Sequence, residues 1–286
     1  MTRFSPSPIA VLDVGGTSIK GGVVRGTEVE HTPSVPTLAN SSADVILGQL
    51  AKSANSALAL SGPGTVGLAI GFPGPFDLQA GAALIQGLHK FDSIYGLELR
   101  PELRTRTTVA NLPIEFVRDN EAAGVGEAVE GAGRGVGRVL TITLGTGMGT
   151  CLTDQGMPVP KVGELSVERL ARRETQWGSA DDVLSARGLA GRLGVATTDL
   201  RDVIGEPASR EIVQDHGRRV GAFLSPIVEE LGADIVIIGG GLAAAFHLFG
   251  PALECALSPT PCVPAALGAD GPLIGAAILA FPTPRR

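Results

Sequence analysis

Short hydrophobic runs alternate along the chain with glycine-rich turns and with longer amphipathic stretches. The runs at 9–14 and 18–25, "IAVLDV" and "SIKGGVVR", predict two strands joined by a tight turn. A helix is predicted over 41–60, because hydrophobic residues recur there on one helical face. Two more buried strands are expected over 65–72 and 113–117, with a helix after the second. Strands separated by helices predict an α/β fold.

The order of strand, glycine turn and strand recurs in the second half of the chain. The segment "RVLTITLGTGMGTCLTD" at 138–154 repeats the opening pattern, and "DIVIIGGGLAAAF" at 234–246 adds a strand, three glycines and a helix. This recurrence predicts two similar α/β domains. We expect a smaller domain over 1–113 and a larger one over 114–270, with a C-terminal helix within 271–286 packing on the first.

The region before residue 234 is predicted to be mostly helical. Hydrophobic residues at helical spacing over 220–231 indicate a helix packed in the core rather than a cofactor site. Pro226 lies inside this stripe and is expected to bend or break the helix, because proline lacks an N–H group and clashes with the preceding turn.

Composition and charge narrow the range of partners. The 286 residues are 44% hydrophobic and 18% charged, which is typical of a folded domain. A net charge of −6 and the lack of a lysine-arginine block argue against a nucleic-acid partner. No hydrophobic run reaches the roughly 18 residues that a membrane span needs, so no membrane partner is expected. Cys151, Cys255 and Cys262 have no C-x-x-C spacing, which favours reduced thiols in a cytoplasmic protein.

The two glycine turns are candidate phosphate sites. Backbone N–H groups in a turn without side chains can point at an anion. The first turn offers Gly15, Gly16 and Thr17, and the second, expected in the other domain, offers 145–147, which is Gly145, Thr146 and Gly147. Each turn alone could be an ordinary hairpin turn. Two such turns in two domains favour a polyphosphate held from opposite sides.

The third glycine cluster has two interpretations. Gly239, Gly240, Gly241 and Ala244 fit the spacing G-x-G-x-x-A after a strand and before a helix, as in dinucleotide-binding folds. That fold also needs a later strand ending in an acidic residue, and "LECALSPTP" is a poor candidate for it. A glycine turn beneath an adenosine is the better interpretation.

Two carboxylates lie where the predicted strands end. Asp13 precedes the first glycine turn, where it could hold Mg²⁺ directly or through water, or cap its own turn. Asp119 follows the strand at 113–117 and precedes a helix. It could be an ordinary helix cap, or it could accept a proton from a substrate hydroxyl that attacks a γ-phosphate.

Taken together, these segments resemble the ROK family (repressors, uncharacterised frames and sugar kinases) of the sugar-kinase, actin and heat-shock-chaperone ATPase superfamily. The similar segments, in the family's order and over nearly the whole chain, are "DVGGTSIKGGVV", "GFPGPFD", "RDNEAAGVGE", "LTITLGTGMGTCL" and "DIVIIGGGLA". The resemblance implies an α/β fold of two ribonuclease-H-like (actin-like ATPase) domains with a cleft between them.

The resemblance also implies residue roles. It makes Asp119 the general base and Asp13 the aspartate associated with Mg²⁺, and it adds Lys20 to the residues that bind ATP. It implies ATP and Mg²⁺ as cofactors, a hexose or amino-sugar hydroxyl as acceptor, and glucokinase-like or fructokinase-like activity. Gly74 and Glu164 are expected to contact the sugar.

Three departures from the family pattern affect these expectations. Arg118 stands where the family has an asparagine that contacts the sugar, and it could instead bind an anionic substrate or affect the acidity of Asp119. The family's cysteine-rich zinc motif is missing after residue 150, so no structural zinc is expected and the chain resembles a branch that lacks that motif. Glu164 is not followed by the family's histidine. His89 and Lys90 either line the sugar pocket or form an exposed pair.

The leading hypothesis is therefore an ATP-dependent sugar kinase. Its alternatives are a catalytically impaired sugar sensor with the same fold, or a kinase that uses polyphosphate as donor. A DNA-binding repressor is disfavoured, because the first strand is expected by Ile9 and leaves no room for a helix-turn-helix before it. The sequence names neither the sugar nor an interface, although a homodimer is compatible with the family resemblance.

Overall fold

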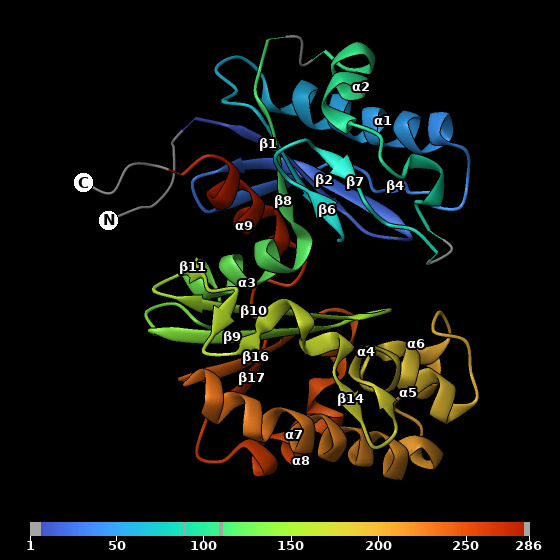
Figure 1. The fold of residues 1–286 in the computed structure, drawn as a ribbon, viewed down its shortest axis with the longest axis vertical. Helices are drawn as coiled ribbons and strands as arrows, with labels where there is room; N and C mark the ends of the chain where they lie inside the picture. The colour runs from blue at the N-terminus through green and yellow to red at the C-terminus, as the bar shows by residue number, and fades with distance from the viewer. Residues whose placement is uncertain (1–6, 88–89, 109–110, 283–286) are drawn as a thin grey trace. The chain divides into compact units, whose positions relative to one another are not determined.

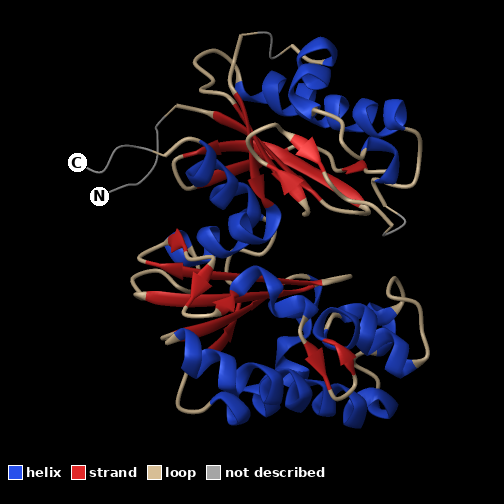
Figure 2. Cartoon of the chain, in the orientation of Figure 1, coloured by secondary structure: helices blue, strands red, loops and turns tan. Residues whose placement is uncertain are grey.

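The computed structural model describes residues 7–87, 90–108 and 111–282. The chain forms two compact units. The first holds the residues up to Ala122 together with those from Ala269 onward, and the second is Ala123–Gly268. Figure 2 shows that both units combine strands with helices.

The first unit is built on a six-stranded sheet in the order β3-β2-β1-β5-β8, with β4 paired to β2. The antiparallel hairpin of β1 and β2 lies at one side, and β1, β5 and β8 run parallel to one another. The strands are β1 (Ile9–Val14), β2 (Ser18–Arg25), β3 (Glu28–His31), β4 (Val35–Pro36), β5 (Leu68–Phe72) and β8 (Ile114–Arg118).

Helices cover both faces of this sheet, as Figure 1 shows. Alternate residues of β1 point to opposite faces: Leu12 and Val14 pack in the cluster that contains α1 and α2, while Ile9 and Val11 pack against α9. A hydrophobic strand buried on both faces is what the run "IAVLDV" predicted. The helices are α1 (Ala43–Ser61), α2 (Leu99–Arg106) and α9 (Asp270–Ala280), with the short strands β6 (Phe76–Asp77) and β7 (Ala82–Ala83) and the short helix η1 (Asp92–Ile94) between them.

The second unit repeats the strand order of the first. Its five-stranded sheet runs β11-β10-β9-β16-β17, with β9 and β10 antiparallel and with β9, β16 and β17 parallel. The expectation of two similar ribonuclease-H-like α/β domains is confirmed. The strands are β9 (Arg138–Leu144), β10 (Met148–Asp154), β11 (Met157–Pro158), β16 (Ile235–Gly239) and β17 (Cys262–Pro264).

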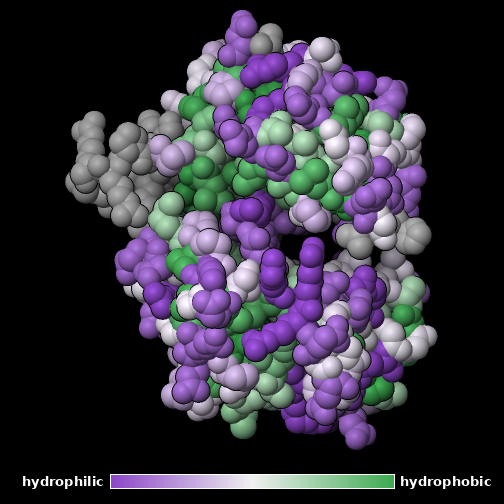
Figure 3. Space-filling view, in the orientation of Figure 1, coloured by the Kyte–Doolittle hydropathy of each residue, from purple (hydrophilic) through white to green (hydrophobic). Residues whose placement is uncertain are grey.

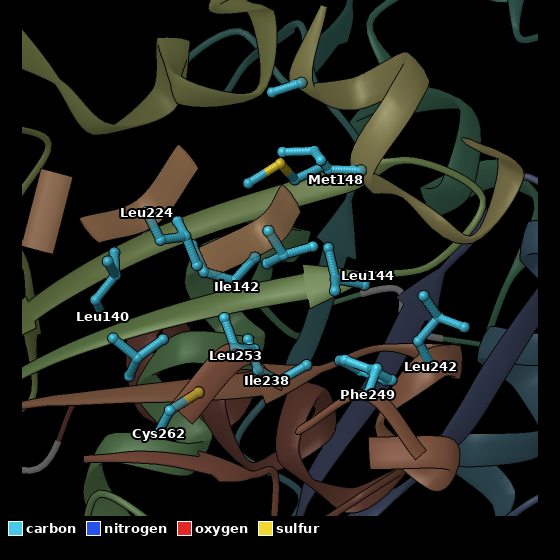
Figure 4. Close-up of a cluster of buried hydrophobic side chains, with 14 of the residues drawn as sticks. Leu140, Ile142, Leu144, Met148, Leu224, Ile238, Leu242, Phe249, Leu253 and Cys262 are labelled. Atoms are coloured by element: carbon cyan, nitrogen blue, oxygen red, sulfur yellow. The ribbon is translucent and has the colours of Figure 1, made fainter. Parts of the chain in front are cut away.

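The core of the second unit lies between this sheet and the long helices α7 (Arg210–Leu231) and α8 (Phe246–Leu257). Figure 4 shows Leu140, Ile142 and Ile238 from the sheet facing Leu224 and Phe249 from the helices. α7 and α8 approach closely at Gly217 and Gly221 of α7, where an added Cβ would overlap the carbonyl oxygen of Phe249 or the Cβ of Ala256.

Two predictions about the second unit can be compared with the structure. Pro226 does not break its helix, since α7 continues through it to Leu231 and packs in the core. The stretch before residue 234 is mostly helical, as predicted, and it also contains two small hairpins. This stretch comprises β12 (Lys161–Val162), β13 (Leu165–Ser166), η2 (Val167–Arg172), β14 (Glu174–Thr175), β15 (Gly178–Ser179), α4 (Ala180–Leu184), α5 (Ala186–Leu193), α6 (Leu200–Val203) and η3 (Pro207–Ser209).

The boundary between the units lies further along the chain than the expected one at 113/114. β8 pairs with β5 and therefore belongs to the first unit. The chain enters the second unit within α3 (Asp119–Glu130), after Ala122, and leaves it after Gly268. α9 then packs on β1 and β5 through Leu273, so that the C-terminal helix completes the first unit.

None of the described helices combines enough length with enough hydrophobicity to cross a bilayer. Figure 3 shows hydrophilic and hydrophobic residues interspersed over the face in view.

A buried histidine in α7 should make the second unit sensitive to acid. His216 is fully buried, and burial, followed by the positive charge of Arg192, lowers its pKa from 6.5 to about 4. Between these pH values the unfolded chain binds the proton more readily than the folded one. We expect about 3 kcal/mol of unfolding free energy to be lost as the pH falls from 6.5 to 4.

The measurement is urea unfolding of the wild type and of His216→Leu over this pH range. The variant should lose that part of the pH dependence, whatever its stability at pH 7. Equal slopes for the two proteins would show that His216 is not the responsible group.

Candidate active site

The first glycine turn closes the β1–β2 hairpin. The N–H of Gly15 donates to the carbonyl of Ser18 at 3.0 Å, and the residues on either side, Val14 and Ile19, are paired. The buried Thr37 stabilises the turn, because its hydroxyl donates a hydrogen bond to the carbonyl of Gly15 at 2.6 Å. Gly16 and Thr17 are exposed at the tip, so their N–H groups are accessible to an anion.

Asp13 and Asp119 lie at the carboxyl ends of parallel strands, the edge at which α/β sheets bind ligands. In register, Asp13 of β1 lies beside Gly71 of β5, which lies beside Val117 of β8. Asp119 begins α3 directly after β8. A Cβ at Gly71 would lie 3.8 Å from the Cα of Asp119, so the glycine allows the start of α3 to lie close to β5. One strand therefore separates the two aspartates.

Burial raises the pKa of Asp119 from its ordinary value of 3.8 to about 6. The backbone N–H of Asn120, 2.8 Å from Oδ1, acts in the opposite direction because it stabilises the carboxylate. The negative charge of Asp13 raises this pKa further, and the positive charge of Lys90 lowers it. Asp119 is thus ionised at neutral pH but basic enough to accept a proton from a hydroxyl that is losing it.

Asp13 is a partly buried carboxylate with a cation across the strand. Lys20 is its cross-strand partner, with Nζ 3.9 Å from Oδ2. Burial raises the pKa of Asp13, and the charge of Lys20 lowers it. Among the described residues, no three His, Cys, Asp or Glu side chains form a group able to hold a metal ion. One or two carboxylates together with substrate phosphates are, however, what Mg²⁺ ordinarily uses.

The second glycine turn closes the β9–β10 hairpin in the same way. The N–H of Gly145 donates to the carbonyl of Gly147 at 2.9 Å. Asp181 of α4 accepts a hydrogen bond from the N–H of Met148 at 2.6 Å, and its Oδ1 would lie 2.7 Å from a Cβ at Gly147. Arg187 of α5 pairs with the other oxygen of Asp181 at 2.8 Å. Sequence patterns did not indicate either charged residue as part of this turn.

The third glycine cluster lies next to the second turn. Gly239 of β16 pairs with Thr143 of β9, so both glycine segments follow the carboxyl ends of adjacent parallel strands. Gly240 has a left-handed backbone, with φ of 78°, and a Cβ there would lie 2.7 Å from the backbone of Leu144. Only glycine fits this close approach. The structure thus brings together 145–147 and 239–241 within the second unit.

The residues expected to contact the sugar lie in different parts of the structure. Gly74 follows β5 and is exposed, and Arg118 ends β8, where its guanidinium pairs with Glu121 at 3.2 Å. Both lie at the sheet edge that carries Asp13 and Asp119. The carboxylate of Glu164, in the second unit, is 99% exposed and pairs with Lys161 at 3.4 Å. His89 lies outside the described residues.

The chain is similar in sequence to one protein family and to several sugar kinases. The sequence model of the ROK family matches residues 9–159. The kanosamine kinase of Amycolatopsis mediterranei is 26% identical over an alignment 295 positions long, gaps included, which covers 94% of this chain and 94% of that protein.

Solved structures with the same fold include two sugar kinases. A ROK family glucokinase from Streptomyces griseus, crystallised with glucose and AMPPNP, superposes with a TM-score of 0.80 at 21% identity over 96% of this chain and 99% of its own. An inorganic polyphosphate/ATP-glucomannokinase from Arthrobacter sp. strain KM superposes with a TM-score of 0.73 at 26% identity, over 96% of this chain and 98% of its own.

Proposed function

This chain belongs to the ROK family and is a sugar kinase, and from that premise we propose that it transfers the γ-phosphoryl group of ATP to a hydroxyl of a hexose or an amino sugar. The observation that carries the proposal is the position of Asp119. It lies one strand away from Asp13 and from the first glycine turn, at one edge of one sheet, with a pKa of about 6.

In the proposed reaction, Asp119 accepts the proton of the attacking sugar hydroxyl. The sugar oxygen forms a bond to the γ-phosphorus, the bond between that phosphorus and the β,γ-bridging oxygen breaks, and ADP leaves with the electron pair. The exposed N–H groups of Gly16 and Thr17 bind phosphate oxygens without side-chain obstruction. The chain contributes mainly placement and charge, as is usual in phosphoryl transfer.

Asp13 is the residue that would hold Mg²⁺ in this site, through water or directly. The ion would neutralise negative charge on the phosphates when bound. Lys20, paired with Asp13 at 3.9 Å, orients that carboxylate beside the turn.

In the second unit, the adjoining segments 145–147 and 239–241 are the proposed nucleotide contacts. Thr146 and Gly147 supply backbone N–H groups, since that of Gly145 is used within the turn, and the glycines after β16 leave an exposed, side-chain-free surface suited to an adenosine. The Streptomyces griseus glucokinase was crystallised with the ATP analogue AMPPNP, which supports ATP as donor. The name of the Arthrobacter enzyme supports inorganic polyphosphate as a second donor to be tested.

A panel of hexoses and amino sugars with ATP and Mg²⁺ tests this function, with ADP release read by a coupled assay. Kanosamine, glucose, mannose and N-acetylmannosamine belong in the panel, and each should be tried with ATP and with polyphosphate. We expect ADP release that depends on one of these sugars. If calorimetry shows that sugars bind but none supports turnover with either donor, the catalytically impaired sensor becomes the better interpretation. Arg118→Asn would then be the first substitution to test.

A further inference from the structure

Lys90 lies over the first glycine turn. Its side chain is partly buried, and its Cδ lies 3.7 Å from where a Cβ at Gly16 would be. Gly16 is at the tip of the turn that offers N–H groups to a phosphate. A lysine stem in contact with this tip brings its ammonium group to the same anion-binding surface, although the residue is far from the turn in sequence.

The position of Lys90 is fixed by the residue that follows it. Phe91 is fully buried, its ring lies 5.3 Å from that of Phe72 at the end of β5, and its N–H donates to the carbonyl of Ala39 at 2.7 Å. Phe91 also has a left-handed backbone, with φ of 62°. That conformation is rare for a bulky residue and persists only where the surrounding structure enforces it. The anchor therefore holds Lys90 at the carboxyl edge of the sheet.

Lys90 also acts on the candidate base. Its charge stabilises the carboxylate form of Asp119. The other two cations at this edge have carboxylate partners: Lys20 pairs with Asp13, and Arg118 pairs with Glu121. Lys90 forms no ion pair within 4.0 Å in the parts of the chain that the structure describes. An ammonium group whose side chain contacts a phosphate turn and whose charge acts on a base, with no carboxylate partner among the described residues, is suited to an anionic ligand.

We propose that Lys90 is a catalytic residue that donates hydrogen bonds to the γ-phosphoryl group of the donor while that group moves from the nucleotide to the sugar. This inference rests on the proposed kinase function. The group in transit carries negative charge on its equatorial oxygens and lies between the phosphates held at 15–17 and the hydroxyl held by Asp119. A fixed positive charge there stabilises the transition state more than the bound substrates.

The competing role for Lys90 is a contact with a sugar hydroxyl. The two roles differ in which ligand loses affinity when the charge is removed. If Lys90 contacts the γ-phosphate, it contributes to the binding of AMPPNP but not to that of ADP, which lacks this phosphate. If Lys90 contacts the sugar, it contributes to the binding of neither nucleotide. The ratio of the two nucleotide affinities therefore isolates the contact, and it can be measured without turnover.

The experiment compares Lys90→Met and Lys90→Arg with Lys52→Met, which removes a lysine from an exposed position on α1. We expect Lys90→Met to lower kcat by about 100-fold and to weaken AMPPNP binding by about tenfold, while ADP binding changes less than twofold. Lys90→Arg, which keeps the charge, should have a kcat of at least about a tenth of the wild-type value. Lys52→Met should behave as the wild type in every assay.

The two failures are distinguishable. If the wild type shows no sugar-dependent turnover with either donor, the proposed function fails before Lys90 is tested. If the wild type is active and Lys90→Met keeps kcat within twofold, or if AMPPNP and ADP affinities change by the same factor, the role of Lys90 is overturned. Melting temperatures within about 3 °C of the wild type show that each variant is folded, and Lys90→Gln, which also removes the charge, serves as the test if Lys90→Met is not folded.

Discussion

Replacing Asp119 with asparagine is expected to reduce sugar-dependent ADP release by about 10²–10⁴-fold while leaving the affinity for AMPPNP within about threefold of the wild type. Asparagine keeps the size of the side chain and can still accept the hydrogen bond from the N–H of Asn120. It cannot accept a proton at neutral pH. The variant therefore removes the proposed base with little change in the start of α3.

The matched control is Asp202→Asn, which removes a carboxylate from an exposed position in α6 and should leave turnover unchanged. Turnover is measured with the best sugar from the panel, and nucleotide affinity by calorimetry. An Asp119→Asn enzyme that turns over at more than a tenth of the wild-type rate would remove the base assignment without touching the family assignment.

The same carboxylate predicts the acid side of the pH profile. Because burial raises the pKa of Asp119 to about 6, its ionised form is lost as the pH falls through that value. We expect kcat/KM to be level above about pH 7, to reach half that value near pH 6 and to approach a tenfold fall per pH unit below about pH 5, as for a single essential base in the free enzyme. A profile that stays level down to pH 5 would mean that this base is not needed in the rate-limiting step.

The parts of this site that the sequence predicted are those that local chemistry determines. Each glycine turn lies between two hydrophobic runs, and the pairs Val14 with Ile19 and Leu144 with Met148 close the two hairpins as expected. Asp119 follows a strand and begins a helix for equally local reasons. A polar residue after a short buried run needs no distant contact to take that position.

The parts that the sequence did not predict depend on contacts between distant segments. The units divide after Ala122 rather than after residue 113, because the pairing of β8 with β5, some forty residues earlier, decides which unit holds the strand. Lys90 reaches Gly16 only because Phe91 is buried against Phe72. Asp181 accepts a hydrogen bond from the N–H of Met148, but it lies in a helix that no sequence pattern connects with the turn. Hydrophobic spacing carries no information about such pairings.

Glu127 of α3 is a buried carboxylate in the part of the second unit where the chain enters and leaves that unit. It is 3% exposed and accepts three backbone hydrogen bonds, from the N–H groups of Ala132 and Ala266 at 3.0 Å each and of Leu267 at 2.8 Å. The chain crosses between the units within α3 and again just after Leu267. One carboxylate therefore ties the two crossing segments to each other.

Replacing Glu127 with alanine should lower the free energy of unfolding by about 3–5 kcal/mol, because three partly buried backbone N–H groups would lose a charged acceptor. For a chain of this size that corresponds to a fall of about 10 °C in melting temperature. Glu127→Gln should cost less, since it keeps the shape and one acceptor oxygen. Gly131→Ala should also destabilise, because its Cβ would overlap the Glu127 carboxylate.

The control for the loss of a glutamate is Glu211→Ala, at an exposed position in the first turn of α7, with an expected cost below about 1 kcal/mol. Calorimetry on the full chain gives the melting temperatures. If Glu127→Ala melts within 2 °C of Glu211→Ala, the three hydrogen bonds do not stabilise the fold. If it melts much lower while Asp119-dependent turnover at 15 °C is retained, Glu127 stabilises the crossing segments without taking part in the chemistry at the start of the same helix.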